Sequence, residues 1–187
     1  KNFRWFVPLC NNRFSKRIMN WYKLGKLNDC TIKDEFLSFK YIKQPIKEEE
    51  TLKWREQGYY HKSFSGSMYS SKNPMPDWVN DVADQVGLDN CGFVFYRMDQ
   101  LDIMPPHIDH FETYCRIFDI DRNDVFRAIV FLQDWQPGHY FEYDGNGLVN
   151  WKKGDYVIYS TNTLHAASNI GIKPRYTLQV TGIKKSK

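Results

Sequence analysis

The chain has 187 residues, of which 26 are basic, 22 are acidic and 42% are hydrophobic, and its net charge at pH 7 is +4. This length suits one domain with a single core. The mixture of charged and apolar residues excludes a disordered tail, and no apolar run approaches the ~20 residues that a membrane-spanning helix needs. We therefore expect a single domain over residues 1–187 and no membrane partner.

The four cysteines, Cys10, Cys30, Cys91 and Cys115, are scattered and form no CxxC pair. In a chain of this size they are typical of reduced thiols in a cytosolic protein, and a disulfide between two of them is the alternative. The first residues also lack the apolar stretch of a secretory signal. These features predict a cytoplasmic location.

The first ninety residues predict a mixed, partly helical extension. Apolar residues recur at helical spacing over 14–22, with Asn12 or Ser15 available as a cap. A clearer helix is predicted from Pro76 to Gly87, because its apolar residues fall on one face and glycine is typical of a helix end.

Two segments between these helices predict loops. The first is the charged run 47–50 (KEEE), and the second is the serine-rich stretch 63–73. Both are typical of solvated loops, and the second could instead form a mobile lid.

From about Cys91 the pattern changes to short segments rich in aromatic and β-branched residues, separated by Gly-Asn-Gly and Lys-Gly-Asp turns. Strands are predicted at 92–97, 126–135, 139–143, 156–160, 164–168 and 175–182. Strands at this spacing without helical patterns between them indicate an antiparallel sandwich or barrel. We expect a mainly β core over 91–183, helices of the N-terminal half packed on one outer face, and a basic tail at 184–187.

The sequence His107-Ile108-Asp109 is a candidate metal-ligand pair. On an extended strand, positions i and i+2 point to the same face, so the imidazole and the carboxylate converge while His110 points the other way. A third ligand must come from another strand, and His165 lies in one. Two imidazoles and one carboxylate on one face of a metal leave open positions, which suits Fe(II) that holds a cosubstrate and oxygen.

The segment 175–182 predicts a strand with one polar and one apolar face. The polar face carries Arg175, Thr177, Gln179 and Thr181, and the apolar face carries Tyr176, Leu178 and Val180. A polar row of this kind faces water or lines a polar pocket. In a pocket, the guanidinium fork would receive a ligand carboxylate beside a hydroxyl group.

The pattern His107-x-Asp109, His165 and Arg175-x-Thr177 resembles the Fe(II)/2-oxoglutarate-dependent dioxygenases. The resemblance covers about 91–183, and the Lys-Gly-Asp turn before 156–160 is similar to that of prolyl-hydroxylase-like members. It implies a double-stranded β-helix (jelly-roll) core.

The resemblance also implies roles for these residues. His107, Asp109 and His165 would hold Fe(II), while Arg175 and Thr177 would bind the 5-carboxylate of the cosubstrate 2-oxoglutarate. The expected reaction consumes O2, yields succinate and CO2, and hydroxylates the substrate. The carboxylate of Asp109 implies hydroxylation, since halogenating members lack it.

Further binding residues are expected around this set. Tyr96 matches a position at which many members contact 2-oxoglutarate. Arg116 and Arg127 are candidates for the cosubstrate's 1-carboxylate or a substrate acid, with a surface ion pair as the alternative. His110 is a candidate to orient substrate. The predicted rim of the substrate pocket comprises Trp135, His139, Tyr140, Tyr143 and the loop 63–73.

The function expected from these features is hydroxylation of a peptide side chain or a small molecule. A nucleobase-oxidising dioxygenase is less favoured, because the basic residues are spread along the chain rather than clustered. Two different functions are compatible with the same β core: a cupin-like metal enzyme or sugar-binding module, and a non-catalytic interaction domain. The three hypotheses differ in whether His107, Asp109 and His165 converge and whether Arg175 shares their cavity.

Overall fold

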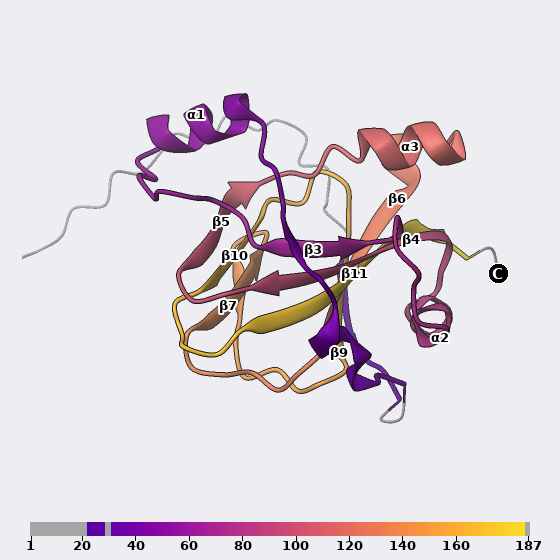
Figure 1. Cartoon of the computed structure of the whole chain (residues 1–187). Helices are drawn as coiled ribbons and strands as arrows, with labels where there is room; N and C mark the ends of the chain where they lie inside the picture. The colour runs from indigo at the N-terminus through magenta and orange to yellow at the C-terminus, as the bar shows by residue number, and fades with distance from the viewer. Residues whose placement is uncertain (1–21, 29–30, 186–187) are drawn as a thin grey trace, which may run out of the picture.

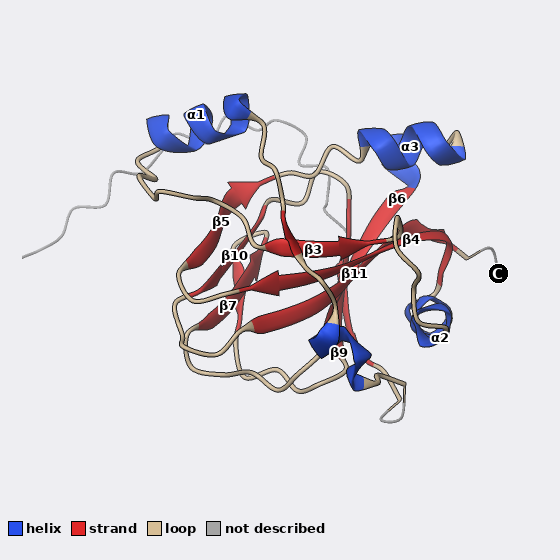
Figure 2. Cartoon of the chain, viewed as in Figure 1, coloured by secondary structure: helices blue, strands red, loops and turns tan. Residues whose placement is uncertain are grey.

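The computed structural model describes residues 22–28 and 31–185, which form two antiparallel sheets with helices around them (Figures 1 and 2). In the described residues, the strands are β1 (Tyr22–Lys26), β2 (Ile42–Lys43), β3 (Ser67–Ser70), β4 (Leu88–Met98), β5 (Asp102–His107), β6 (Val125–Phe131), β7 (His139–Tyr143), β8 (Asn146–Leu148), β9 (Asp155–Ser160), β10 (His165–Asn169) and β11 (Arg175–Lys184). The helices are α1 (Glu48–Glu56), α2 (Trp78–Val86), α3 (Glu112–Phe118) and the 3-10 turns η1 (Asp34–Ser38) and η2 (Arg122–Asp124).

The larger sheet has the strand order β1-β9-β6-β11-β4-β3-β2, and the smaller one has the order β5-β10-β7-β8. The mainly β prediction is confirmed, and all six predicted strand segments overlap observed strands. The first ninety residues were predicted as a mixed, partly helical extension, but they also supply strands to the larger sheet. Their strand β1 pairs with β9, and their strand β3 pairs with β4, so they extend the larger sheet at both edges.

The predicted helix at 76–87 is confirmed as α2, which ends at Gly87 in the left-handed conformation with φ 77°. Its buried side chains include Val79 and Val82, which pack with Leu178 and Val180 of β11 on the outer face of the larger sheet. An N-terminal helix therefore covers that outer face, as expected. The trace in Figure 1 shows α2 lying beside β4.

The helix α1 lies elsewhere, near the end of β5 (Figure 1). Its one buried side chain is Trp54, which packs against Phe64 and Met104 and donates its indole N–H to the Pro106 carbonyl at 3.3 Å. The loop predicted at 47–50 is wrong, because three glutamates open this helix and two basic residues close it. Charges in this order favour a helix through its dipole, so the charged run is the first turn of α1 rather than a solvated loop.

Other local predictions also need correction. The stretch 63–73 contains the strand β3, whose polar residues pair with β4 near the edge of the sheet. The helix predicted at 14–22 lies outside the described residues except for Tyr22, which begins a strand. The basic tail was predicted at 184–187, but Lys184 is the last residue of β11. The next residue, Lys185, forms an ion pair with Asp84 on α2.

Cys91 and Cys115 are free thiols, as predicted, while Cys10 and Cys30 lie outside the described residues. Among the helices that the structure describes, none is long and apolar enough to cross a membrane.

Candidate metal and cosubstrate site

Three predicted metal ligands converge where β5 and β10 pair. His107 is the last residue of β5 and lies opposite His165, the first residue of β10. The carboxylate of Asp109 approaches both: its Oδ1 is 3.8 Å from His107 Nε2, and its Oδ2 is 3.5 Å from His165 Nε2. One ligand atom from each of the three lies within 4.8 Å of the others. The convergence is as predicted, although Asp109 lies beyond the end of β5 rather than on it.

Both imidazoles are held by backbone carbonyls. Nδ1 of His107 is 2.8 Å from the Pro105 carbonyl oxygen, and Nδ1 of His165 is 3.0 Å from that of Thr163. A carbonyl oxygen can only accept, so each Nδ1 carries the proton and each Nε2 presents its lone pair to the centre of the group. This is the tautomer that a metal-binding histidine needs, and the backbone sets its orientation.

The electrostatics of the group favour neutral histidine and ionised carboxylate. Burial, together with the neighbouring His107, lowers the pKa of His165 from 6.5 to about 4. Burial alone would raise the pKa of Asp109, but the Arg127 guanidinium and the two histidines outweigh it and lower that pKa. A neutral imidazole and a carboxylate are the forms that bind a cation. The donor set therefore fits a divalent metal with nitrogen and oxygen ligands.

Arg175 lies in the same cavity as these three residues. The cavity has a volume of about 60 Å³, and its lining includes Tyr96, His107, Asp109, His165, Arg175 and Thr177. On the polar face of β11, Arg175, Thr177 and Gln179 line this cavity and Thr181 lines the adjoining groove, while the apolar face packs in the core with α2. The predicted alternation is confirmed. Tyr96 lies opposite Thr177 on the neighbouring strand, and its hydroxyl accepts the Gly66 N–H at 2.6 Å.

The guanidinium of Arg175 is buried without an acidic partner. Its side chain contacts Met98, with Nη1 2.9 Å from the sulfur, and it lies over the rings of Phe141 and Trp151. Within the described residues, Nε of Arg175 has no hydrogen-bond partner and no carboxylate forms an ion pair with this side chain. Burial lowers its pKa to about 10. A buried cation without a counter-ion is costly, and a bound anion would relieve that cost.

Tyr159 on β9 is a residue that the sequence did not indicate. Its ring centroid is 5.1 Å from that of His165, and its buried hydroxyl has no hydrogen-bond partner in the described part of the chain. Burial raises the pKa of this phenol, so it stays protonated and can donate. Nothing in the segment YVIYS distinguishes this tyrosine from an ordinary core aromatic.

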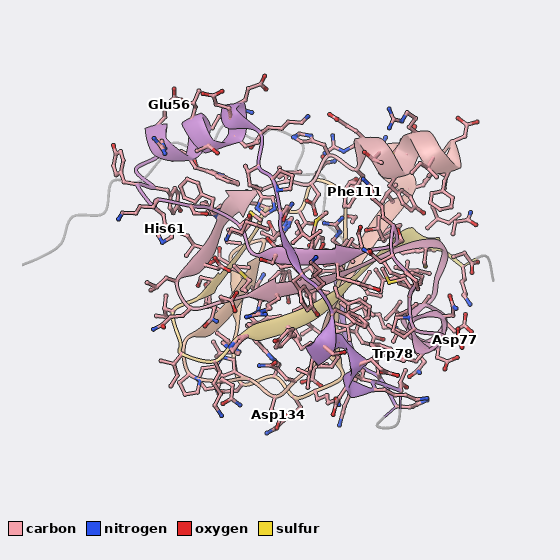
Figure 3. The ribbon with its side chains drawn as sticks, viewed as in Figure 1. Glu56, His61, Asp77, Trp78, Phe111 and Asp134 are labelled. Carbon is pink, nitrogen blue, oxygen red and sulfur yellow. The ribbon has the colours of Figure 1, made fainter. Side chains whose placement is uncertain are left out.

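Arg127 on β6 lies against the metal-ligand group rather than on the surface. Its Nη1 is 2.5 Å from Asp109 Oδ2, and its guanidinium lies 4.6 Å from the centroid of the Phe111 ring. Figure 3 labels Phe111, which directly precedes α3. Arg116 is exposed on α3 and lines neither this cavity nor the adjoining groove. Of the two arginines predicted as anion-binding candidates, only Arg127 reaches the site.

A larger groove of about 900 Å³ adjoins the cavity and shares Gln44 and Arg127 with it. Residues of α1, α3 and β4 line the groove, and they include Lys47, Lys53, Glu49, Glu50, Glu112, Phe111, Tyr114 and Ile117. His110, a predicted substrate residue, is also in its lining, as is Ser71 from the stretch 63–73.

The predicted pocket rim at Trp135 and His139 is wrong in position. His139 is 2% exposed, its ring stacks on Trp151, and its Nε2 contacts the Lys173 carbonyl at 2.9 Å. Trp135 donates its indole N–H to the His139 carbonyl at 2.8 Å, and Tyr143 is buried between the sheets. Because none of these residues lines the cavity or the groove, they belong to the packing of the smaller sheet.

Comparison with known proteins supports the fold. No protein-family model matches the chain, and no curated protein matches it. A prolyl-4-hydroxylase from Pseudomonas putida is similar in structure over 90% of this chain and 95% of that chain, with 15% identity and a TM-score of 0.56.

Two more solved structures are similar at lower scores. One is the nickel complex of the non-heme monooxygenase ThoJ, with 14% identity over 62% of this chain and 57% of that one and a TM-score of 0.44. The second is a Klebsiella pneumoniae protein with a double-stranded β-helix domain, with 17% identity over 54% and 74% and a TM-score of 0.35. The two antiparallel sheets and the similarity to the prolyl-4-hydroxylase over 90% of the chain support the double-stranded β-helix fold, and the chain carries a His-Asp-His group suited to a metal.

Proposed function

We propose that the protein is an Fe(II)- and 2-oxoglutarate-dependent oxygenase that hydroxylates a peptide side chain or a small molecule. The observation that carries this proposal is the buried, acid-free guanidinium of Arg175 in the same cavity as His107, Asp109 and His165. A metal site alone needs no such cation. A diacid that chelates the metal through one end and meets an arginine with the other explains both features.

In this proposal, His107, Asp109 and His165 hold Fe(II). Arg175 pairs with the distal carboxylate of 2-oxoglutarate, and Thr177 donates a hydrogen bond to it. When bound, Fe(II) and 2-oxoglutarate supply O2 activation, with oxidative decarboxylation to succinate and CO2 and transfer of a hydroxyl group to the substrate.

The remaining wall of the cavity supports the same assignment. Met104, Ile129 and Phe141 line the cavity and exclude water from the ion pair, which strengthens it. Tyr96 lies on the same wall as Thr177 and is proposed to contact the cosubstrate.

The groove of about 900 Å³ is proposed as the approach for substrate, with His110 at its side. Its charged residues are mixed in sign, since Lys47 and Lys53 are accompanied by Glu49, Glu50 and Glu112. A groove that binds the phosphate backbone of a nucleic acid is typically basic along its length. This mixture favours a peptide or a small molecule over nucleic acid.

The test is anaerobic addition of Fe(II) and 2-oxoglutarate to the protein. We expect a visible metal-to-ligand charge-transfer band, its loss in Asp109→Ala, and its retention in Asp134→Ala, where an exposed carboxylate that pairs with Lys152 is removed. Succinate formation under O2 would then identify substrates in a screen. Metal binding without any 2-oxoglutarate-dependent band would contradict the proposal and favour a cupin-like metal enzyme or sugar-binding module.

A further inference from the structure

Asp109 differs from the two histidines in how the fold holds it. His107 and His165 are paired across β5 and β10, so the sheet fixes their backbones. Asp109 lies two residues beyond the end of β5, in the turn that leads to α3. A ligand on such a turn needs support from outside the sheet if its carboxylate is to keep one orientation.

Arg127 is placed to give that support. It lies on β6, where it pairs with Thr181 of β11 on one side and Tyr159 of β9 on the other. Both Nε and Nη2 of its guanidinium are 3.2 Å from the Thr181 hydroxyl oxygen, while Nη1 is bound to Asp109 Oδ2. The Nε and Nη2 atoms therefore anchor the guanidinium to β11, while Nη1 binds the Asp109 carboxylate.

The same arginine also contacts the turn at a second point. Its guanidinium lies over the ring of Phe111, which adopts a left-handed backbone with φ 55°. That conformation is unfavourable for a bulky residue, so surrounding contacts must maintain it. The backbone carbonyl of Asp109 in turn accepts a hydrogen bond from Arg122 at 3.2 Å. The turn is therefore held at the Asp109 side chain, the Asp109 backbone and the Phe111 ring.

We infer that Arg127 is a positioning residue for the metal site: it commits one oxygen of Asp109 to a hydrogen bond, so that Asp109 offers the other to the metal. This inference rests on the proposed metal site, but it does not depend on 2-oxoglutarate. Two effects of Arg127 oppose each other, because a guanidinium repels a cation while it orients the ligand. We expect orientation to dominate, since loss of an outer partner of a metal ligand typically weakens metal binding about 10- to 100-fold.

The test is titration of the full chain with Co(II), followed by absorbance in the visible range and by calorimetry. Arg127→Gln should weaken Co(II) binding about 10- to 100-fold and change the ligand-field spectrum. Arg127→Lys, which keeps one donor and the charge, should restore part of the affinity. Thr181→Val should have a smaller effect, about 2- to 10-fold, because it removes the hydroxyl that accepts both anchoring hydrogen bonds but leaves the guanidinium itself in place.

Arg97→Gln is the matched control, because Arg97 forms its ion pair with Asp99 away from the cavity. Circular dichroism and thermal melting identify variants that fail to fold, and Thr181→Val and Arg127→Lys then decide the question. Unchanged or tighter Co(II) binding in a folded Arg127→Gln variant, or an equal loss in Arg97→Gln, would overturn the inference. Wild-type protein that binds Co(II) but shows no 2-oxoglutarate-dependent band with Fe(II) would contradict the proposed function and leave this inference standing. Wild-type protein that binds no metal would overturn both.

Discussion

The two faces of the larger sheet are built from the same strands but differ in what they contact. On the outer face, Leu178 and Val180 pack against α2 in an apolar layer. On the inner face, Arg175 and Thr177 of the same strand border a cavity that holds buried charge. The first face contributes stability through apolar burial, whereas the second places an uncompensated cation in the interior at a cost. The uncompensated cation on the inner face is the feature on which the proposed ligand site rests.

The largest expected effect is on ligand affinity at Arg175, where a substitution should separate ligand binding from stability. Arg175→Met replaces a buried, acid-free cation with an apolar side chain, so the ligand-free protein should keep or gain thermal stability. Affinity for 2-oxoglutarate should fall by about 30-fold or more, since removing one partner of a buried charge pair costs about 2–5 kcal/mol. Thermal melting and calorimetric titration with 2-oxoglutarate in the presence of Mn(II) measure the two quantities. A large loss of stability without ligand would show that Arg175 supports the fold instead.

The reciprocal change is Leu178→Ala on the outer face. Leu178 is fully buried, and its truncation should lower the free energy of unfolding by about 2–5 kcal/mol. Metal affinity of the folded variant should stay at the wild-type value, because the substituted side chain points away from the cavity. Urea unfolding and Co(II) titration check this pair of outcomes. Weakened metal binding in a folded variant would mean that the two faces are coupled.

A pH titration of stability sharpens the comparison on the inner face. Above pH 6.5, His165 is neutral in both the folded and the unfolded chain. As the pH is lowered from 6.5 to about 4, the unfolded chain takes up a proton that the buried imidazole does not bind. The free energy of unfolding therefore decreases over this range by roughly 3 kcal/mol in total. The pKa of Asp109 is lowered in the fold, so its own contribution is lost only at pH values below its ordinary 3.8.

Urea unfolding of the metal-free protein at several pH values measures this slope. His165→Gln should flatten it between pH 6.5 and 4, while His61→Gln, which removes a histidine outside the cavity, should leave it unchanged. An equal slope in wild type and His165→Gln would show that another group is responsible.

The smallest expected effect lies on the outer face at Gly87. This residue ends α2 with φ 77°, and no atom lies within 4 Å of an added Cβ, so only the backbone conformation opposes a side chain. Gly87→Ala should therefore destabilise the protein by about 1 kcal/mol. Thermal melting measures it, and a loss comparable to that of Leu178→Ala would mean that α2 itself has been displaced.

Local patterns predicted much of the core and of the site. The alternation along β11 and the apolar stripe of α2 each repeat with the period of their element, and His107-x-Asp109, His165 and Arg175 follow a spacing that resembles a known family. The first two patterns are each local to one element, so the sequence alone was sufficient to predict them. The third spans residues 107–175 and was predicted from the family resemblance rather than from a local period.

The errors concern residues whose environment is set by distant partners. Arg127 meets Asp109 only because β6 of the larger sheet lies close to the segment that follows β5 of the smaller sheet, and no local pattern indicates that contact. His139 follows Pro137-Gly138, which is typical of an exposed loop, but stacking on Trp151 buries it. The strand β5 contains two adjacent prolines, which ordinarily argue against a strand.

The strands supplied by the first ninety residues have a consequence for any shortened form of the protein. A fragment that began at residue 91 would retain every proposed metal ligand, yet it would lose β1 beside β9 and β3 beside β4. Two rows of backbone N–H and carbonyl groups would then be open to pairing with other chains. Such a fragment is expected to self-associate, which size-exclusion chromatography would detect, so the half of the chain that carries the proposed metal ligands is not expected to fold as an independent module.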